Sequence, residues 1–172
     1  MNESARMMLV LVGVCIASAL LLSMVYGQTQ PRIIENREKA LEEAIYMAQP
    51  KAKQVDALGV QEGLIQEAYE LSDDSGSQVG YAVLIEFNGF QGAIRTVYGL
   101  DNDFKITGVR VLEHTETPGL GSKIAGDEFL NQFKGDTPGD VSVDAITGAT
   151  ISSKALIDAV KESLGEAREV LT

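Results

Sequence analysis

The sequence contains few residues that could form disulfides, hold a metal ion or contact a polyanion. Its 172 residues include one Cys, one His and no Trp, and 14 Lys and Arg stand against 25 Asp and Glu. A single Cys excludes a disulfide scaffold and a Cys-ligated zinc module. The basic residues are scattered, whereas phosphate contacts need clustered Lys and Arg. We therefore expect no nucleic-acid partner and no metal site in the protein.

The remaining composition is that of one folded domain. With 45% hydrophobic and 23% charged residues, the chain is too apolar to be disordered, and its length suits a single domain. Glu3 and Arg6 cancel each other near the N-terminus, so the later part carries the whole net charge of −11. The sequence therefore predicts a strongly acidic soluble part.

The apolar residues are concentrated near the N-terminus. Met7–Tyr26 (MMLVLVGVCIASALLLSMVY) contains no charged residue, and its length matches the roughly 30 Å core of a bilayer crossed by a helix. The alternative is a cleaved signal peptide, with Val25 and Gly27 as the small residues before the cut. The run is longer than the roughly 7–15 residue apolar core of such a peptide. We expect an uncleaved anchor within residues 1–27, with Cys15 as an inert residue of its helix.

The rest of the chain predicts an α+β domain behind a connecting segment. Residues 28–62 are expected to hold a polar link at 28–31, a juxtamembrane helix that ends before Pro50, and a linker without a clear period. In the domain, 63–172, four strand-like runs joined by short Gly, Asn and Asp turns predict an antiparallel sheet, with strands at 65–71, 80–87, 93–100 and 105–112. Flanking helices are expected at 127–133 and 152–171.

Two glycine-rich polar loops lie between these elements. In His114–Ser122 (HTETPGLGS), Gly119 and Gly121 around Leu120 allow a close ligand approach that a Cβ would block, although a simple surface turn explains them as well. The other loop, Asp144–Ser153 (DAITGATISS), leads into a helix N-terminus and offers several hydroxyls. Free N–H groups and the helix dipole make that position suitable for a phosphate, whereas an ordinary N-cap needs only one such hydroxyl.

Both loops match motifs of a known domain family. Asp144-Ala-Ile-Thr147-Gly148-Ala149-Thr150 resembles the D-x-x-[S/T]-G-A-[T/S] signature of FMN-binding domains that carry flavin as a phosphoester on the last hydroxyl residue. Glu116-Thr117-Pro118-Gly119-Leu120-Gly121 resembles the E-T-P-G-L-G element upstream in that domain. Thr147 stands where Ser is common, and Gly89 and Gly92 resemble a weaker element near the flavin. The best fit is the family of G subunits of Rnf-type ion-translocating oxidoreductases; the related C subunits of sodium-translocating NADH:quinone oxidoreductases are larger.

The resemblance implies covalent FMN on one threonine. Thr150 would bear the flavin, with a binding site formed by Asp144, Thr147, Gly148, Ala149, Glu116, Thr117, Gly119, Leu120 and Gly121. A threonine hydroxyl is a weak nucleophile, and the loop supplies no adjacent His or Lys as a base. The resemblance therefore implies a separate, Mg²⁺-dependent flavin transferase that uses FAD as donor and reads the signature including Asp144.

The resemblance also implies a role in electron transport. The chain would be a redox subunit of a membrane-bound, ion-translocating ferredoxin:NAD-type oxidoreductase complex, transferring single electrons through FMN, with no catalytic side chain and no substrate turnover of its own. The implied partners are the other membrane and peripheral subunits and an extracytoplasmic redox partner. The soluble domain would lie outside the cytoplasm, behind a short cytoplasmic N-terminus.

Two other functions remain open from the residues. The chain could be the FMN-binding domain of another membrane-linked flavin reductase, or an anchored, non-catalytic binding module in which the Thr150 loop only caps a helix. His114 is assigned no chemistry, because a lone His without a second ligand nearby is usually a locally hydrogen-bonded loop residue.

Overall fold

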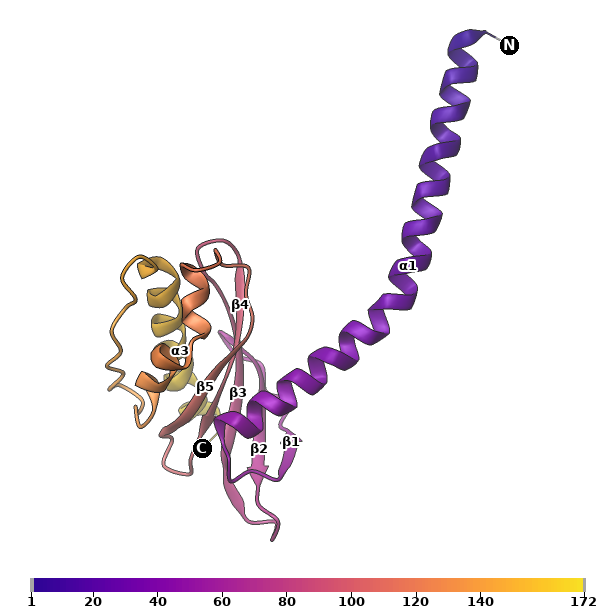
Figure 1. Ribbon diagram of the computed structural model, residues 1–172. Helices are drawn as coiled ribbons and strands as arrows, with labels where there is room; N and C mark the ends of the chain where they lie inside the picture. The colour runs from indigo at the N-terminus through magenta and orange to yellow at the C-terminus, as the bar shows by residue number, and fades with distance from the viewer. Residues whose placement is uncertain (1, 172) are drawn as a thin grey trace. The chain divides into compact units, whose positions relative to one another are not determined.

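The computed structural model describes residues 2–171 and begins with a single long helix, α1 (Glu3–Ala48) (Figure 1). The expected polar link at 28–31 is wrong, because α1 continues through Pro31. The residues that flank this proline include good helix formers such as Gln, Arg and Glu, which favour continuation. The chain divides into two units between Lys39 and Ala40, so the end of α1 belongs to the second unit.

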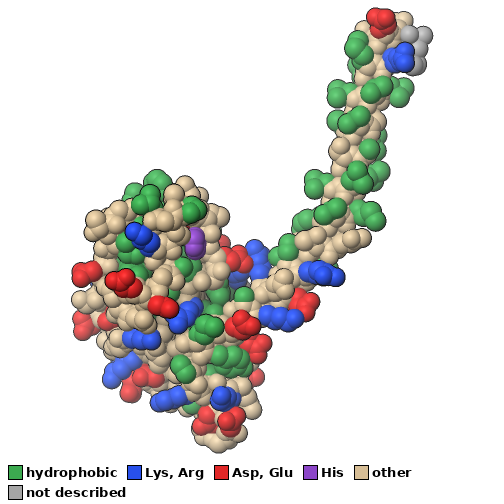
Figure 2. All heavy atoms as spheres, viewed as in Figure 1, with side chains coloured by type: hydrophobic (Ala, Val, Ile, Leu, Met, Phe, Trp, Pro, Cys, Tyr) green, Lys and Arg blue, Asp and Glu red, His purple; other side chains and the backbone are tan. Residues whose placement is uncertain are grey.

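The first unit has the character of a membrane-spanning helix. α1 is long and apolar enough to cross a bilayer, and its most apolar stretch is wholly exposed. Figure 2 shows hydrophobic side chains along this part of the helix, on both of its visible edges, with Lys, Arg, Asp and Glu on the turns that follow. A helix segment that is uncharged and apolar over 20 residues suits a lipid environment.

The second unit is built on an antiparallel sheet whose strands follow one another in chain order. The strands are β1 (Gln54–Ala57), β2 (Ile65–Ser72), β3 (Gln78–Asn88), β4 (Ala93–Leu100) and β5 (Ile106–Glu113). The predicted antiparallel sheet is confirmed, and each of its four expected strands is present within one or two residues. β1 was expected as linker. It is a short, mostly exposed edge strand, so it lacks the alternation that marks a half-buried strand.

One face of the sheet is covered by the C-terminal elements. These are η1 (Gly121–Ala125), α2 (Asp127–Leu130), η2 (Asn131–Phe133) and α3 (Thr150–Val170). Leu156, Val160 and Leu164 of α3 are fully buried against this face, as the apolar stripe predicted. The helix expected at 127–133 is present as α2 followed by η2. α3 starts at Thr150, two residues before the expected helix, which makes this threonine its first residue.

The end of α1 packs on the opposite face of the sheet. The carbonyl of Ala48 accepts a hydrogen bond of 2.7 Å from the Thr107 hydroxyl. Gly99 and Gly108 are paired across β4 and β5, and a Cβ at either would lie about 3 Å from the Ala48 backbone. Two opposed glycines therefore provide the space in which α1 ends on the sheet, and the compact unit includes Ala40–Ala48 for this reason.

Candidate functional site

Three segments that are distant in sequence line one cavity of about 320 Å³. They are the turn between β3 and β4, the loop that leads into η1, and the start of α3 with the residues just before it. The lining residues are Phe90, Glu116, Thr117, Leu120, Gly121, Gly148, Ala149, Thr150, Ile151 and Ser152. Seven of the predicted site residues are among them, so the structure brings the two sequence motifs together.

Thr150 lies at the mouth of this cavity as the first residue of α3, and its side chain is exposed. Ala149 occupies the N-cap position, where no side chain hydrogen-bonds to the first turn. Gly148 precedes it with φ of +83°, a conformation that glycine adopts readily. The alternative that a hydroxyl of this loop caps the helix is therefore wrong, and the first N–H groups of α3 remain available to a ligand.

Ser153 holds the signature loop against α3 from within the helix. Its buried hydroxyl accepts a hydrogen bond of 3.1 Å from the N–H of Ile146 and donates one of 2.9 Å to the carbonyl of Ala149. These two bonds fix the backbone on both sides of Thr147 and Gly148. They therefore hold the turn that precedes Thr150 in one conformation.

Glu116 is the buried acidic group of the site. Its side chain is 4% exposed. One carboxylate oxygen accepts the N–H of Gln91 at 2.9 Å, and the other accepts the Ser152 hydroxyl. Burial by itself would raise the pKa of Glu116, but the hydrogen bonds from Ser152, Gln91 and Phe90, with His114 nearby, hold that pKa below its ordinary value. Glu116 therefore remains ionised at neutral pH.

The two glycines nearest to this carboxylate leave room for it. A Cβ on Gly121 would lie 2.7 Å from one carboxylate oxygen of Glu116, and a Cβ on Gly89 would lie 2.5 Å from the other. The sequence suggested that Gly121 lacks a side chain so that a ligand can approach closely. In the structure, the atoms that a Cβ on Gly121 would meet belong to Glu116 and Ser152. His114 accepts the N–H of Glu116 through Nδ1 at 3.2 Å, which confirms a local hydrogen bond for this imidazole.

Exposed apolar side chains surround the cavity. Phe90 is 62% exposed, Leu120 51% and Ile151 60%, although side chains of this size are usually buried. Sequence reasoning identified Leu120 and counted Ser152 among the hydroxyls of the signature loop, but it missed Phe90 and Ile151. The signal for Phe90 was its place between Gly89 and Gly92. Ile151 and Ser152 directly follow Thr150, and their places at the cavity could be assigned only once the start of α3 was known.

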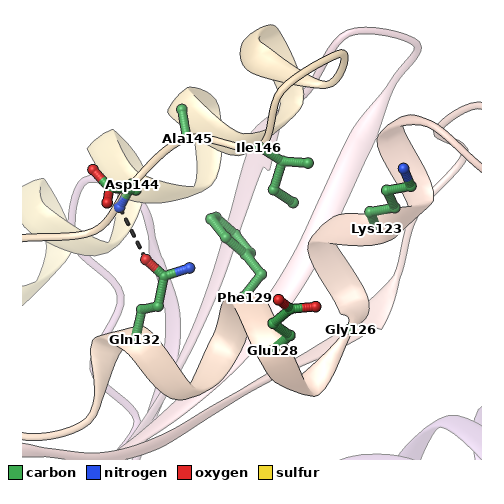
Figure 3. Close-up of a pocket in the computed structure, with 8 residues that line it drawn as sticks. All are labelled: Lys123, Gly126, Glu128, Phe129, Gln132, Asp144, Ala145 and Ile146. Atoms are coloured by element: carbon green, nitrogen blue, oxygen red, sulfur yellow. Dashed lines mark hydrogen bonds between the residues drawn. The ribbon is translucent and has the colours of Figure 1, made fainter.

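Asp144 lies at a second cavity, of about 510 Å³, between α2 and the segment Asp144–Ile146 (Figure 3). The N–H of Asp144 donates to the side-chain oxygen of Gln132 at 3.0 Å, the bond drawn dashed in Figure 3. Thr147 and Gly119 are exposed and line neither cavity. The predicted set is therefore divided: Asp144, Thr147 and Gly119 lie apart from the cavity at Thr150. Within residues 2–171, no cluster of His, Cys, Asp and Glu is arranged to hold a metal ion.

Comparisons with known proteins identify the domain and its fold. The family model for the FMN-binding domain matches residues 89–165, which contain every residue that lines the cavity. The C subunit of the Na⁺-translocating NADH-quinone reductase from Parabacteroides distasonis has a similar fold, with a TM-score of 0.61 and 19% identity over 82% of this chain and 96% of that one. NqrC from Shewanella oneidensis is similar with a TM-score of 0.52 and 23% identity over 69% and 68% of the two chains.

More extensive sequence similarity identifies the family. The chain is 34% identical to the G subunit of the ion-translocating oxidoreductase complex of Methanosarcina acetivorans, over 95% of this chain and 94% of the relative. It is 30% identical to the G subunit of the same complex from Aliivibrio fischeri, over 91% and 86%. The G subunit of a Na⁺-translocating ferredoxin:NAD⁺ oxidoreductase complex from Acetobacterium woodii is 32% identical over 74% and 70%. The chain belongs to the family of G subunits of ion-translocating oxidoreductase complexes, as its two motifs predicted, and is an electron-transfer subunit.

Proposed function

We propose that this chain carries FMN as a phosphoester on Thr150 and thereby passes electrons within a ferredoxin:NAD-type ion-translocating complex. FMN supplies the one-electron chemistry when it is bound. The observation that carries the proposal is the exposed Thr150 hydroxyl at the uncapped start of α3, next to a cavity with an apolar rim.

The start of α3 suits the phosphate of the cofactor. The helix extends from Thr150 to Val170, and its N-terminus presents unpaired N–H groups together with the positive end of the helix dipole. Ala149 and Gly148 bring no bulky side chain to this position. A phosphoester on Thr150 would be stabilised there without a basic side chain.

The apolar rim suits the flavin ring. Phe90, Leu120 and Ile151 offer exposed apolar surface from the three segments that line the cavity. Covering these side chains with an aromatic ring removes apolar surface from water on both partners. The site residues would therefore bind and orient the ring, while the ionised Glu116 remains satisfied by its own hydrogen bonds.

Attachment of the flavin requires a separate transferase. Thr150 follows a turn without His or Lys, and His114 is not among the residues that line the cavity. Asp144 is exposed at the second cavity, where a maturation enzyme could contact it without entering the flavin cavity. We therefore assign Asp144 to recognition by the transferase.

The placement in the membrane follows the same proposal. Residues 1–27 comprise a short cytoplasmic N-terminus and an uncleaved anchor, and the following turns of α1 connect it to the FMN-binding domain outside the cytoplasm. The compact unit of this domain begins at Ala40, before the expected boundary at residue 63, because the end of α1 and β1 pack with the sheet. A covalent link suits this side of the membrane, because FMN lost there could not be replaced from the cellular pool. The partners are the other membrane and peripheral subunits of the complex, with an extracytoplasmic redox partner for the domain.

The experiment compares Thr150 with a hydroxyl outside the signature in protein produced together with a flavin transferase. The unchanged chain should remain yellow after denaturation and gain the mass of one FMN less one water. Thr150→Ala should lose both properties, whereas Thr150→Ser should retain them at least in part. Ser142→Ala is the matched control, because this exposed hydroxyl precedes the signature and does not line the cavity, so the variant should keep its flavin. Covalent flavin on Thr150→Ala would refute the assignment.

A further inference from the structure

The carboxylate of Glu116 connects all three segments that line the flavin cavity. It belongs to the loop before η1, it accepts the N–H of Gln91 in the turn that carries Phe90, and it accepts the hydroxyl of Ser152 in the first turn of α3. Glu116 and Ser152 are both nearly inaccessible to water, at 4% and 3% exposure. A single side chain therefore determines how two walls of the cavity lie relative to each other.

The packing around the carboxylate makes this connection specific. Gly89 and Gly121 have no side chain in the places where a Cβ would collide with the Glu116 oxygens. A shorter acid would not reach both donors, and an amide has only one oxygen with which to accept two hydrogen bonds. A buried donor left without its acceptor costs free energy, so the walls move when the carboxylate is replaced.

We propose that Glu116 is the positioning residue of the flavin cavity: through Ser152 and Gln91 it holds the first turn of α3 and the Phe90 turn in place as two walls of the cavity. This inference rests on the proposed function, since it assumes that FMN is attached at Thr150. It assigns to Glu116 an indirect role in place of direct contact with the cofactor. Thr150 anchors the flavin at one end, and the walls held by Glu116 keep its ring in a fixed orientation.

The first test uses full-length protein without flavin, produced without the transferase. Glu116→Ala removes the acceptor of the Gln91 N–H. Loss of a hydrogen bond to a charged group shifts the equilibrium between the closed and the open form of that amide by at least about tenfold. Amide hydrogen exchange at Gln91 should therefore accelerate by about tenfold or more. Glu116→Gln retains one acceptor oxygen. Its exchange rate at Gln91 should therefore lie between the rates of Glu116→Ala and of the unchanged chain. Exchange at Gln91 that is unaltered in Glu116→Ala would overturn the proposal.

The second test uses full-length protein with attached flavin. In Glu116→Ala the mass of FMN should remain, while the visible circular dichroism and the fluorescence anisotropy of the flavin both decrease, because the ring is no longer held in one orientation. Glu116→Gln should give intermediate values of both signals. Attached flavin with unaltered dichroism and anisotropy in Glu116→Ala would show that Glu116 only supports the fold.

Ser152→Ala and Ser163→Ala form a milder, matched pair. Both serines are buried in α3 and hydrogen-bonded to a side chain, Ser152 to Glu116 and Ser163 to Tyr98, and they lie about 16 Å apart along the helix. Ser152→Ala should lower the flavin dichroism and anisotropy, whereas Ser163→Ala should lower only the melting temperature. Equal flavin signals in the two variants would contradict the proposal even if Glu116→Ala failed to fold. If the unchanged chain carried no covalent flavin, the proposed attachment to Thr150 would be refuted. The role of Glu116 would still be tested by the exchange measurement, which uses protein without flavin.

Discussion

The carboxylate of Glu116 and the hydroxyl of Ser152 are hydrogen-bonded inside the protein although 36 positions separate them in the sequence. The bond joins the loop after β5 to the first turn of α3, two residues beyond Thr150. An ionised side chain therefore joins two of the segments that line the cavity at Thr150. This arrangement predicts how the stability of the domain responds to acid.

Acid should destabilise the domain through Glu116. Its pKa in the folded protein lies below the ordinary value of 4.5, because the hydrogen bonds from Ser152 and from the backbone outweigh burial. The charged form is therefore favoured by folding, and its contribution is fully present above 4.5 and is lost as the pH falls through the lower, folded-state pKa. Melting temperatures measured from about pH 7 down to about pH 3 should decrease less steeply in Glu116→Gln than in the unchanged chain.

The control for this pH series is Glu162→Gln, which removes the same charge from an exposed position on α3. It should retain the steep decrease of the unchanged chain. A Glu116→Gln protein that loses stability in acid as steeply as Glu162→Gln would contradict the prediction.

Side chains on the glycine pair beneath α1 should destabilise the domain. In Gly99→Ala or Gly108→Ala, the new Cβ would lie about 3 Å from the Ala48 backbone, and such overpacking costs about 1–3 kcal/mol of unfolding free energy. Gly165→Ala is the control, because nothing lies within 4 Å of its added Cβ inside α3. This control should stabilise by about 0.5–1 kcal/mol. Urea unfolding of the three variants measures the difference, and equal midpoints would argue against a tight contact at Ala48.

Asp144 should matter for maturation and little for stability. Its side chain is exposed, and its backbone N–H donates a hydrogen bond to the side chain of Gln132. Asp144→Asn should therefore change the unfolding free energy by no more than about 0.5 kcal/mol, while the fraction of chains that acquire flavin decreases. Asp158→Asn, an exposed substitution on α3, should alter neither quantity. A large loss of stability in Asp144→Asn would assign the residue to orienting the loop.

The sidedness of the domain can be tested with single cysteines. Cys15 is the only cysteine, so Cys15→Ala combined with Lys51→Cys creates one exposed thiol just after α1. A membrane-impermeant maleimide should label it in intact cells whose outer layer has been permeabilised. Asn2→Cys in the same background should be labelled only after lysis. Labelling of Asn2→Cys but not of Lys51→Cys before lysis would indicate the opposite orientation. If the mature protein lacked residue 2, the N-terminal segment would be a cleaved signal peptide.

Much of the fold could be predicted from the sequence because its signals are local. The charge-free run Met7–Tyr26 predicts a spanning helix from composition alone. Strand-forming runs separated by short Gly, Asn and Asp turns likewise mark β2, β3, β4 and β5. β1 could not be predicted in this way, since a short, exposed edge strand is defined by its pairing with β2. The continuation of α1 through Pro31 likewise went against a strong local preference.

The sequence by itself determined the two motifs, and with them the family and the candidate attachment residue Thr150. Only the tertiary structure decided which residues share the cavity with it. It brought Phe90 and Ser152 to the site, placed Asp144 at a different cavity, and packed Gly121 against Glu116. The physical reason is that a motif is read along the chain, whereas contacts between distant segments are set by strand register and by the packing of α3 on the sheet.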